Sequence, residues 1–306
     1  MRFHRILDPT FLTLPAIAMM LFVASCGGGG KKNDKKKSEF EKMSKSDSAK
    51  DSRVVNVGGK LFSVPSPIQT AFLIEKSGAK FNESLLNDPS NVSRYPTKFE
   101  KAINLGIYGA DLGYVTIYDN QQKSFKYLTS IRKLARDIGV ESAFDKTLVK
   151  RFKDNVGDQD SMLALVSDAY KMGDAYLKKN DRSDVAGLIL AGGWIESLFF
   201  ATKVAQKGNK MVKERVAMQK TSLKNLIKLL GKKRHKEKVN DLVEGLEELY
   251  GVYEEIEMTY QYKEPKTKPK EKLTVLKSDT KVKISKKQMK SIRKQIKEIR
   301  NQITGQ

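Results

Sequence analysis

Apolar residues recur at helical spacing over most of the chain, from about residue 67 to residue 258. Gly139, Gly157, Gly208 and Gly231 fall between the periodic segments, where the left-handed residue that ends a helix is expected. Short loops between successive helices favour antiparallel hairpins. The pattern therefore predicts an all-α fold, either a multi-helix bundle or an irregular array of helical hairpins. The predicted helices are Pro67–Ser77, Pro96–Tyr118, Lys123–Ile138, Ser142–Lys153, Asp160–Lys179, Ser183–Lys207, Lys210–Leu230 and Lys236–Glu257.

Short β-prone runs flank this helical region. Val54–Val64 contains two such runs around Gly58 and Gly59, which is typical of a small hairpin. Near the C-terminus, Leu273–Leu276 and Val282–Ile284 are short apolar runs that could pair with each other. The sequence thus predicts a few short strands in a chain that is otherwise helical.

A last helix is predicted over Ser285–Ile303, and it is amphipathic. One side is a narrow apolar stripe, and the opposite side is almost wholly Lys and Arg. The stripe could pack on the helical region, on another helix or on an acidic surface, and the sequence leaves these three possibilities open. The stripe consists of Met289, Ile292, Ile296, Ile299 and Ile303.

The segment Asn104–Asp119 is apolar around most of its helical circumference, which predicts a central helix. Glycine costs about 1 kcal/mol per helical position relative to alanine, so Gly106, Gly109 and Gly113 need a compensating role. Close approach of a neighbouring helix or of a ligand would supply one. Asp111 lies in this apolar sequence and would be costly to bury without a hydrogen-bond partner.

A second strongly apolar helix is predicted over Val185–Ala205, where Glu196 is the one charged residue before Lys203. Its length would allow it to cross a membrane. An acid at mid-segment costs about 2.5–3.5 kcal/mol in a bilayer, so a buried helix of a water-soluble domain is the preferred interpretation. Trp194 and Glu196 are two positions apart and should point to different sides of this helix.

The two apolar helices carry the candidate chemistry. In the simpler interpretation, Asp111 and Glu196 are structural carboxylates with satisfied hydrogen bonds. In the alternative, Tyr108, Asp111, Trp194 and Glu196 surround a cleft that binds a small ligand or a glycan, and paired carboxylates could catalyse hydrolysis there. No catalytic residue is assigned, and the sequence indicates no metal site and no cofactor.

The N-terminus has the pattern of an export signal. Arg2 and Arg5 precede an apolar run, Phe11–Val23, that is too short to span a bilayer comfortably. The run ends in Val23-Ala24-Ser25-Cys26, which resembles the lipobox of bacterial lipoproteins. The resemblance implies cleavage before Cys26, a diacylglyceryl group on its sulfur and an acyl group on its new amino terminus. Cys26 is also the only cysteine, so the chain offers its thiol no disulfide partner.

Charge is concentrated at the two ends of the chain. The chain has 58 Lys plus Arg against 36 Asp plus Glu, a net charge of +22, and the segment 261–306 alone has fifteen basic and four acidic residues. The segment after Cys26 is rich in glycine and lysine and too polar to form a core, which predicts a solvated tether. The predicted organisation is a signal peptide at 1–25, a disordered tether at 26–53, a helical domain at 54–260 and a basic tail at 261–306 that ends in the amphipathic helix.

Three stretches resemble a group of uncharacterised all-helical lipoproteins from Bacteroidota: Val64–Asn91, Asn104–Asp119 and Leu190–Ala205. The resemblance implies an envelope location and an all-α fold, and it implies no activity. The tether begins GGGGKKNDKKK, which is basic, whereas lipoproteins of that phylum that reach the cell surface carry an acidic sequence there. An outer-membrane anchor with the domain facing the periplasm is therefore expected.

Three functions remain open at this level. The first is a lipid-anchored helical module that binds a ligand or a protein partner. The second is a periplasmic hydrolase that uses Asp111 and Glu196. The third is a structural spacer whose basic tail binds an anionic envelope polymer. Nucleic acid is not expected as a partner, because the export signal removes the protein from the cytoplasm.

Overall fold

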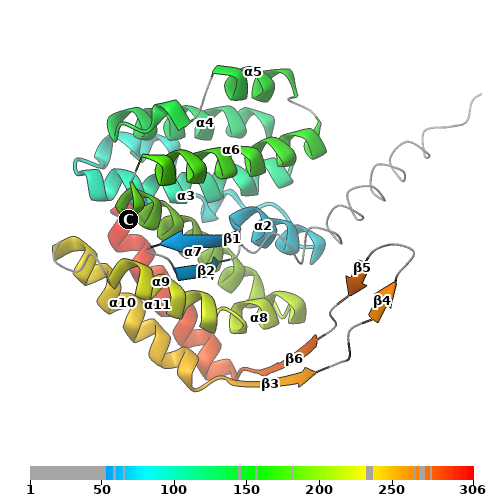
Figure 1. Ribbon diagram of the computed structural model, residues 1–306. Helices are drawn as coiled ribbons and strands as arrows, with labels where there is room; N and C mark the ends of the chain where they lie inside the picture. The colour runs from blue at the N-terminus through cyan, green and yellow to red at the C-terminus, as the bar shows by residue number, and fades with distance from the viewer. Residues whose placement is uncertain are drawn as a thin grey trace, which may run out of the picture. The chain divides into compact units, whose positions relative to one another are not determined.

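The computed structural model describes residues 53–57, 60–64, 66–143, 146–155, 158–180, 182–231, 237–262, 264, 266–268, 273–275 and 278–306 (Figure 1). Helices dominate this part of the chain, and the strands form small two-stranded ribbons. The prediction of an all-α fold is therefore confirmed. The predicted signal peptide, Cys26 and nearly all of the predicted tether lie outside the described residues.

Two helices form the centre of the fold, α3 (Lys98–Ile117) and α7 (Ser183–Ala205), and they pack against each other. α3 begins with a capping box, in which the Glu100 N–H donates to Thr97 Oγ1 at 3.2 Å and the Thr97 N–H donates to Glu100 Oε2 at 3.0 Å. Every α3 residue from Ala102 to Ile117 is buried, so the predicted central helix is confirmed.

The glycines of α3 and α7 allow the two backbones to meet. A Cβ atom on Gly106 would lie 2.0 Å from the Ile189 carbonyl oxygen, and one on Gly192 would lie 1.9 Å from the Ile103 carbonyl oxygen. Backbone atoms cannot move aside as a flexible side chain can. The compensating role that the sequence required of Gly106 is thus close approach of a neighbouring helix.

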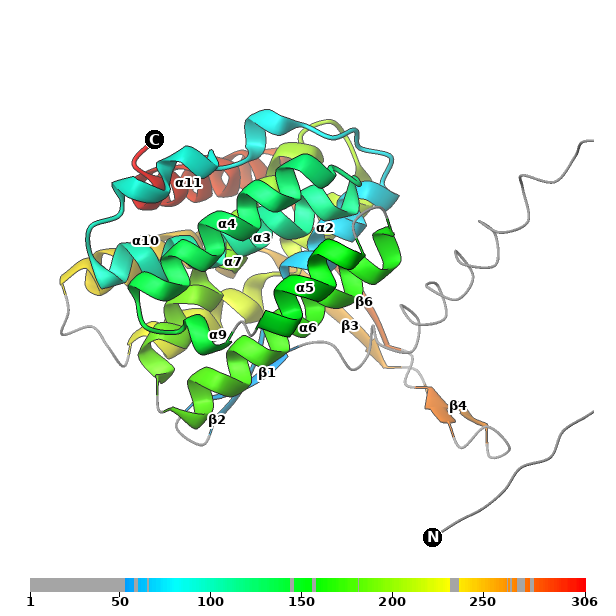
Figure 2. The same ribbon diagram turned by 90° about the horizontal axis from the view of Figure 1, so that it is seen from above.

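The remaining helices surround this pair on several sides (Figures 1 and 2). α4 packs on α3, α2 and α6 pack on both central helices, and α8, α9 and α11 pack on α7. α10 covers α9 and α11, and α5 packs on α6. Their bounds are α2 Pro67–Lys76, α4 Gln121–Asp137, α5 Lys146–Asp154, α6 Gln159–Lys179, α8 Lys210–Ala217, α9 Lys220–Gly231, α10 Glu237–Glu254 and α11 Lys286–Thr304.

One helix in the described part of the chain is long and apolar enough to cross a membrane, Asp184–Ala205 within α7. In the structure, 78% of its apolar window is buried against the rest of the protein. A lipid-facing helix would need that surface for acyl chains. This packing agrees with the sequence interpretation of the segment as a buried helix.

One predicted helix is divided in two. The sequence predicts a continuous helix over Lys210–Leu230, but the structure has α8 and α9 separated by Met218 and Gln219. At this break, the Gln219 side chain donates to the Arg215 carbonyl at 3.0 Å and accepts from the Trp194 indole at 3.1 Å. The prediction of a single helix was wrong. No glycine or proline marks the break, and the contact made there, between Gln219 and Trp194, joins residues that are far apart in the sequence.

The predicted N-terminal hairpin is present. β1 (Arg53–Val57) pairs antiparallel with β2 (Lys60–Val64), with Val55 opposite Phe62, and β2 lies beside α9. The hairpin thus closes against the helical domain at the point where the predicted tether ends.

The strands near the C-terminus pair differently from the prediction. β5 (Leu273–Val275) pairs with β4 (Lys266–Lys268), and β6 (Ser278–Lys283) pairs with β3 (Glu257–Tyr262). Pairing of Leu273–Leu276 with Val282–Ile284 is therefore wrong. Each run has its partner earlier in the chain, in a segment whose composition predicted a helix end and a proline-containing linker. We refer to the paired strands β3 and β6 as the ribbon.

The C-terminal helix α11 belongs to the helical core. Its apolar stripe is buried, with exposed fractions of 6% for Met289, 0% for Ile292 and Ile296, 6% for Ile299 and 8% for Ile303. Of the three partners left open by the sequence, the stripe packs on the helical domain, against α7 and α10. The predicted tail at 261–306 therefore ends in a core helix.

Candidate functional site

The four candidate site residues lie on the two central helices, and all are buried. Tyr108 and Asp111 belong to α3, and Trp194 and Glu196 belong to α7. The exposed fraction is 3% for Trp194 and 0% for the other three. The structure brings the two carboxyl groups into interaction with each other in the core. It does not place them in a surface cleft.

Glu196 forms a buried, two-pronged ion pair with Arg300 of α11. Arg300 Nε donates to Glu196 Oε2 at 2.7 Å, and Nη2 donates to Oε1 at 2.9 Å. The side chains are 4% and 0% exposed. A guanidinium that meets both carboxylate oxygens gives a strong and directional charge-assisted contact. This ion pair fixes α11 to α7.

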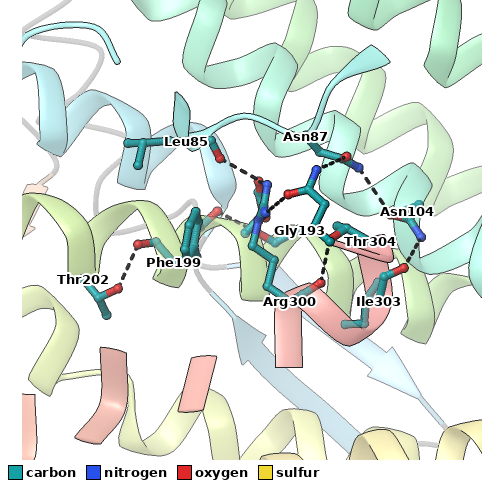
Figure 3. A network of polar contacts seen from close by, with 12 residues as sticks. Leu85, Asn87, Asn104, Gly193, Phe199, Thr202, Arg300, Ile303 and Thr304 are labelled. Carbon is teal, nitrogen blue, oxygen red and sulfur yellow. Dashed lines mark hydrogen bonds and ion pairs between the residues drawn. The ribbon is translucent and has the colours of Figure 1, made fainter. Parts of the chain in front are cut away.

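Two further donors of Arg300 also have partners (Figure 3). Nη2 donates to the Leu85 carbonyl at 3.2 Å, and Nη1 donates to Gln306 Oε1 at 2.8 Å. The guanidinium carbon lies 4.5 Å from the centre of the Phe199 ring. A buried charge is tolerated when its hydrogen bonds are complete and an aromatic face covers it. Arg300 thus joins α11, α7 and the loop before α3.

Asp111 is the uncompensated member of this cluster. Neither of its oxygens accepts a hydrogen bond from the described side chains. Burial, and next the charge of Glu196, raise the pKa of Asp111 well above its ordinary range, although Arg300 opposes this shift. Burial also raises the pKa of Glu196, against the effect of Arg300. Burial beside a second carboxyl thus disfavours the charged form of Asp111.

A second group of polar side chains surrounds Asn87 and includes the C-terminus (Figure 3). Gln306 Nε2 donates to Asn87 Oδ1 at 3.2 Å, and Asn87 Nδ2 donates to the Tyr95 hydroxyl at 2.9 Å. Asn104 Nδ2 donates to the Ile303 carbonyl at 3.0 Å. These contacts tie the end of the chain to the loop before α3 and to α3 itself.

Tyr108 has a structural hydrogen bond. Its hydroxyl donates to the Asp88 carbonyl at 2.9 Å, and its ring centre lies 6.3 Å from that of Tyr95 and 5.9 Å from that of Tyr127. Burial raises the pKa of the Tyr108 hydroxyl, so it remains protonated at physiological pH. The hydroxyl positions the loop that precedes α3.

Trp194 faces away from the carboxyl cluster. Its indole N–H donates to Gln219 Oε1 at 3.1 Å, on the side of α7 that contacts α8. The prediction that Trp194 and Glu196 point to different sides of one helix is confirmed. A cavity of about 10 Å³ lies beside Trp194 and Gln219, which is room for about one water molecule. The four candidate residues therefore do not share one pocket.

A larger depression lies elsewhere, between α8, the base of the ribbon and the start of α11. It is an open groove of about 660 Å³ whose lining includes Val282, Ile284 and both Lys and Glu side chains. None of the four candidate residues lines it. The described residues also contain no group of three His, Cys, Asp or Glu side chains that could hold a metal ion.

Sequence reasoning missed Arg300 and Asn87, which organise the buried polar contacts. One signal for Arg300 was available. It lies four residues after Ile296 and three before Ile303, so it interrupts the buried stripe of an amphipathic helix. A cation on that face requires a buried partner, and Glu196 was the unpaired acid of the apolar helix. Asn87 lies in a loop where no periodicity applies.

Comparison of the chain with protein-family models, with curated proteins and with solved structures finds no match. The function is therefore argued from the geometry and the sequence of this chain.

Proposed function

We propose that the protein is a lipid-anchored component of the cell envelope, whose helical domain serves as a binding module that faces the periplasm. The anchor is supported by the N-terminal sequence, in which a short apolar run ends at the only cysteine, Cys26. One acyl chain holds a protein only marginally, whereas several chains anchor it firmly. The mature domain would then work in water beside a membrane.

One observation supports binding over catalysis. The buried charged side chains of the core bind one another, whereas the lysines of α11 remain on the surface. Arg300 and the apolar stripe fix the inner face of α11 to the core. The outer face is exposed and carries five lysines, with Glu298 as its acidic residue. We call this surface the α11 basic face; its lysines are Lys286, Lys287, Lys290, Lys294 and Lys297.

A neighbouring lysine extends this surface onto α7. Lys203 lies 5.4 Å from the centre of the Phe199 ring, on which Arg300 also packs. Burial lowers the pKa of Lys203, and the charges of Lys297 and Arg293 lower it further. Cations that crowd in this way favour an anionic partner, because its charge relieves their mutual repulsion. An anionic envelope polymer, or an acidic protein surface, has this property.

The hydrolase hypothesis lacks a comparable support. General acid–base catalysis requires a carboxyl group within hydrogen-bond reach of the substrate. Asp111 and Glu196 are each 0% exposed, and Glu196 is occupied by Arg300. A substrate would have to displace the contact that holds the C-terminal helix.

The anchor is tested by the variant Cys26→Ser. We expect the wild-type protein to sediment with membranes and the variant to appear in the soluble fraction. Ser25→Ala is the matched control, because it keeps a small residue before the cysteine and should remain with the membranes. Retention of the Cys26→Ser protein on membranes would refute the anchor.

The α11 basic face is tested by Lys287→Glu/Lys290→Glu, with Lys150→Glu/Lys153→Glu on α5 as the control of equal charge change. Binding of fluorescently labelled polyphosphate, an anionic polymer without acyl chains, is titrated. We expect the α11 variant to bind at least about tenfold more weakly and the control to bind nearly as the wild type does. Equal losses in both variants would show that only the net charge of the protein matters, and would refute a dedicated surface.

A further inference from the structure

The ribbon exposes an unusual share of the large apolar side chains. All six residues of β3 are exposed. In the described part of the chain, the exposed large hydrophobic residues are Met211 at 51%, Met258 at 37%, Tyr260 at 63% and Tyr262 at 69%. Three of these four belong to β3 and are spaced two residues apart.

Alternate residues of a strand share one face of its sheet, so Met258, Tyr260 and Tyr262 point the same way. The register places Val282, Thr280 and Ser278 opposite them on that face. The other face has Glu257 opposite Lys283, Thr259 opposite Lys281 and Gln261 opposite Asp279. Among the side chains that the structure describes, one face of the ribbon therefore carries Met258, Tyr260, Tyr262 and Val282, and the other carries Glu257, Lys281 and Lys283. We call the first the tyrosine face.

The charge of this segment indicates the sign of a partner. Residues 257–283 contain eight lysines and four acidic residues. Lys283 and Glu257 form an ion pair of 3.7 Å between side chains that are 84% and 76% exposed, so water and salt screen it strongly. Lys281 and Lys283, the two of these lysines whose exposure the structure describes, both lie exposed to solvent.

We propose that the ribbon is a membrane-contact element, whose tyrosine face lies in the interface of an anionic lipid bilayer. Tyrosine is suited to that position, because its ring is apolar and its hydroxyl stays at the level of the headgroups. Lys281 and Lys283 lie on the opposite face of the ribbon, so they attract it to an anionic surface through their field rather than by direct contact with headgroups. An extended anionic polymer would attract the lysines, but it would offer Met258 no apolar interior. The bilayer satisfies both the apolar and the cationic residues.

The ribbon is long enough to contact a membrane beside the domain. The proposal that it does so rests on the proposed lipid anchor at Cys26. Strands of six residues span roughly 20 Å at about 3.3 Å per residue. In both views β3 and β6 lead away from the helices toward β4 and β5 (Figures 1 and 2). A lipid anchor would hold the domain close to a bilayer, so that even weak contacts of the ribbon are made at high effective concentration.

The test uses the mature chain with Cys26→Ser, so that no acyl chain contributes to binding. Flotation with vesicles of phosphatidylcholine, alone or mixed with phosphatidylglycerol, measures the bound fraction at low and high salt. We expect binding to the mixed vesicles at low salt and its loss at high salt. Binding to both vesicle types alike, or to neither, would overturn the proposal.

Two ribbon variants separate the tyrosine face from the charge. Tyr260→Ser/Tyr262→Ser should weaken binding to the mixed vesicles about tenfold or more, because two rings lose their burial in the interface. Lys281→Gln/Lys283→Gln, on the opposite face of the ribbon, should weaken it less, by at most about fivefold per lysine. The control Lys150→Gln/Lys153→Gln on α5 removes the same charge and should bind as the parent chain does. Unchanged binding of the tyrosine variant would overturn the proposal.

Two measurements keep the interpretation clear. Trp194 is the only tryptophan and is 3% exposed, so its emission spectrum reports that each variant is folded. Polyphosphate, an anionic polymer without acyl chains, is titrated in parallel, and a ribbon that binds this polymer but no vesicle would overturn the bilayer as partner. Membrane retention of the acylated protein is independent of these results. A failed vesicle test would therefore leave the proposed anchor standing.

Discussion

Removal of Arg300 should destabilise the fold strongly, because it leaves a buried carboxylate without its cation. The side chain is 4% exposed, and its partner Glu196 is 0% exposed. Breaking a buried ion pair by removing one partner costs about 3–5 kcal/mol. Arg300→Met keeps an apolar side chain of similar length, so we expect a loss of about 4 kcal/mol in the free energy of unfolding. For a domain of this size, that corresponds to a decrease in Tm of roughly 8–16 °C.

Urea unfolding followed by the fluorescence of Trp194 measures this loss, in a chain that carries Cys26→Ser. Arg293→Met is the matched control, because Arg293 lies on the same helix and is partly exposed near other cations. We expect the control to change the stability by no more than about 0.5 kcal/mol. The double variant Glu196→Gln/Arg300→Met removes the unpaired charge. It should recover about 2 kcal/mol relative to Arg300→Met.

The loss should also depend on pH. Burial already raises the pKa of Glu196 in the folded protein, and without Arg300 the pKa should rise further. A raised folded pKa gives stability at low pH that is lost as the pH rises through it. Arg300→Met should therefore be less destabilising at pH 5 than at pH 8. A loss below about 1 kcal/mol that is independent of pH would refute the role assigned to the ion pair.

Two further predictions concern the central helices. Gly192→Ala should lower the free energy of unfolding by at least about 3 kcal/mol, because its Cβ would lie 1.9 Å from the Ile103 carbonyl oxygen. The control Gly251→Ala places its Cβ in open space, so it should be neutral or slightly stabilising in the same urea assay. Asp111→Asn should stabilise the protein at neutral pH. Because the pKa of Asp111 is raised, the folded chain keeps a proton that the unfolded chain releases above about pH 4. The wild-type protein therefore loses about 1.4 kcal/mol of stability per pH unit until the pH passes the raised pKa. Unfolding of both proteins between pH 5 and 8 should show an advantage of the Asn variant that grows with pH; a constant difference would mean that Asp111 is already ionised.

The local elements could be predicted because their determinants are local. Apolar periodicity located the helices, and Gly139 and Gly208 have the positive φ values, 73° and 89°, that were expected between helices. The same expectation was wrong for Gly231, which is the last residue of α9 and has no positive φ, and Gly157 lies outside the described residues. The all-round apolar character of α3 correctly predicted its central position. Glycine spacing predicted a close contact on Gly106 but could not name α7 as the neighbour.

The contacts that hold the site together could not be predicted, because they join distant segments. Arg300 binds Glu196 and the Leu85 carbonyl, which lie 104 and 215 residues away in the chain. No periodicity encodes such pairs. The same reason explains the wrong strand pairing near the C-terminus, since register depends on which two runs meet. The exposed tyrosines of β3 were assigned to a helix end and a linker, where aromatic residues carry no specific prediction.

We propose that acyl chains on Cys26 hold the helical domain at a membrane. Mass spectrometry of the N-terminal peptide of the protein purified from its native membranes tests this claim most directly. We expect a peptide that begins at Cys26 and carries the mass of a diacylglyceryl group and an added acyl chain. A peptide with an unmodified Cys26 thiol, or with the leader still attached, would contradict the proposal.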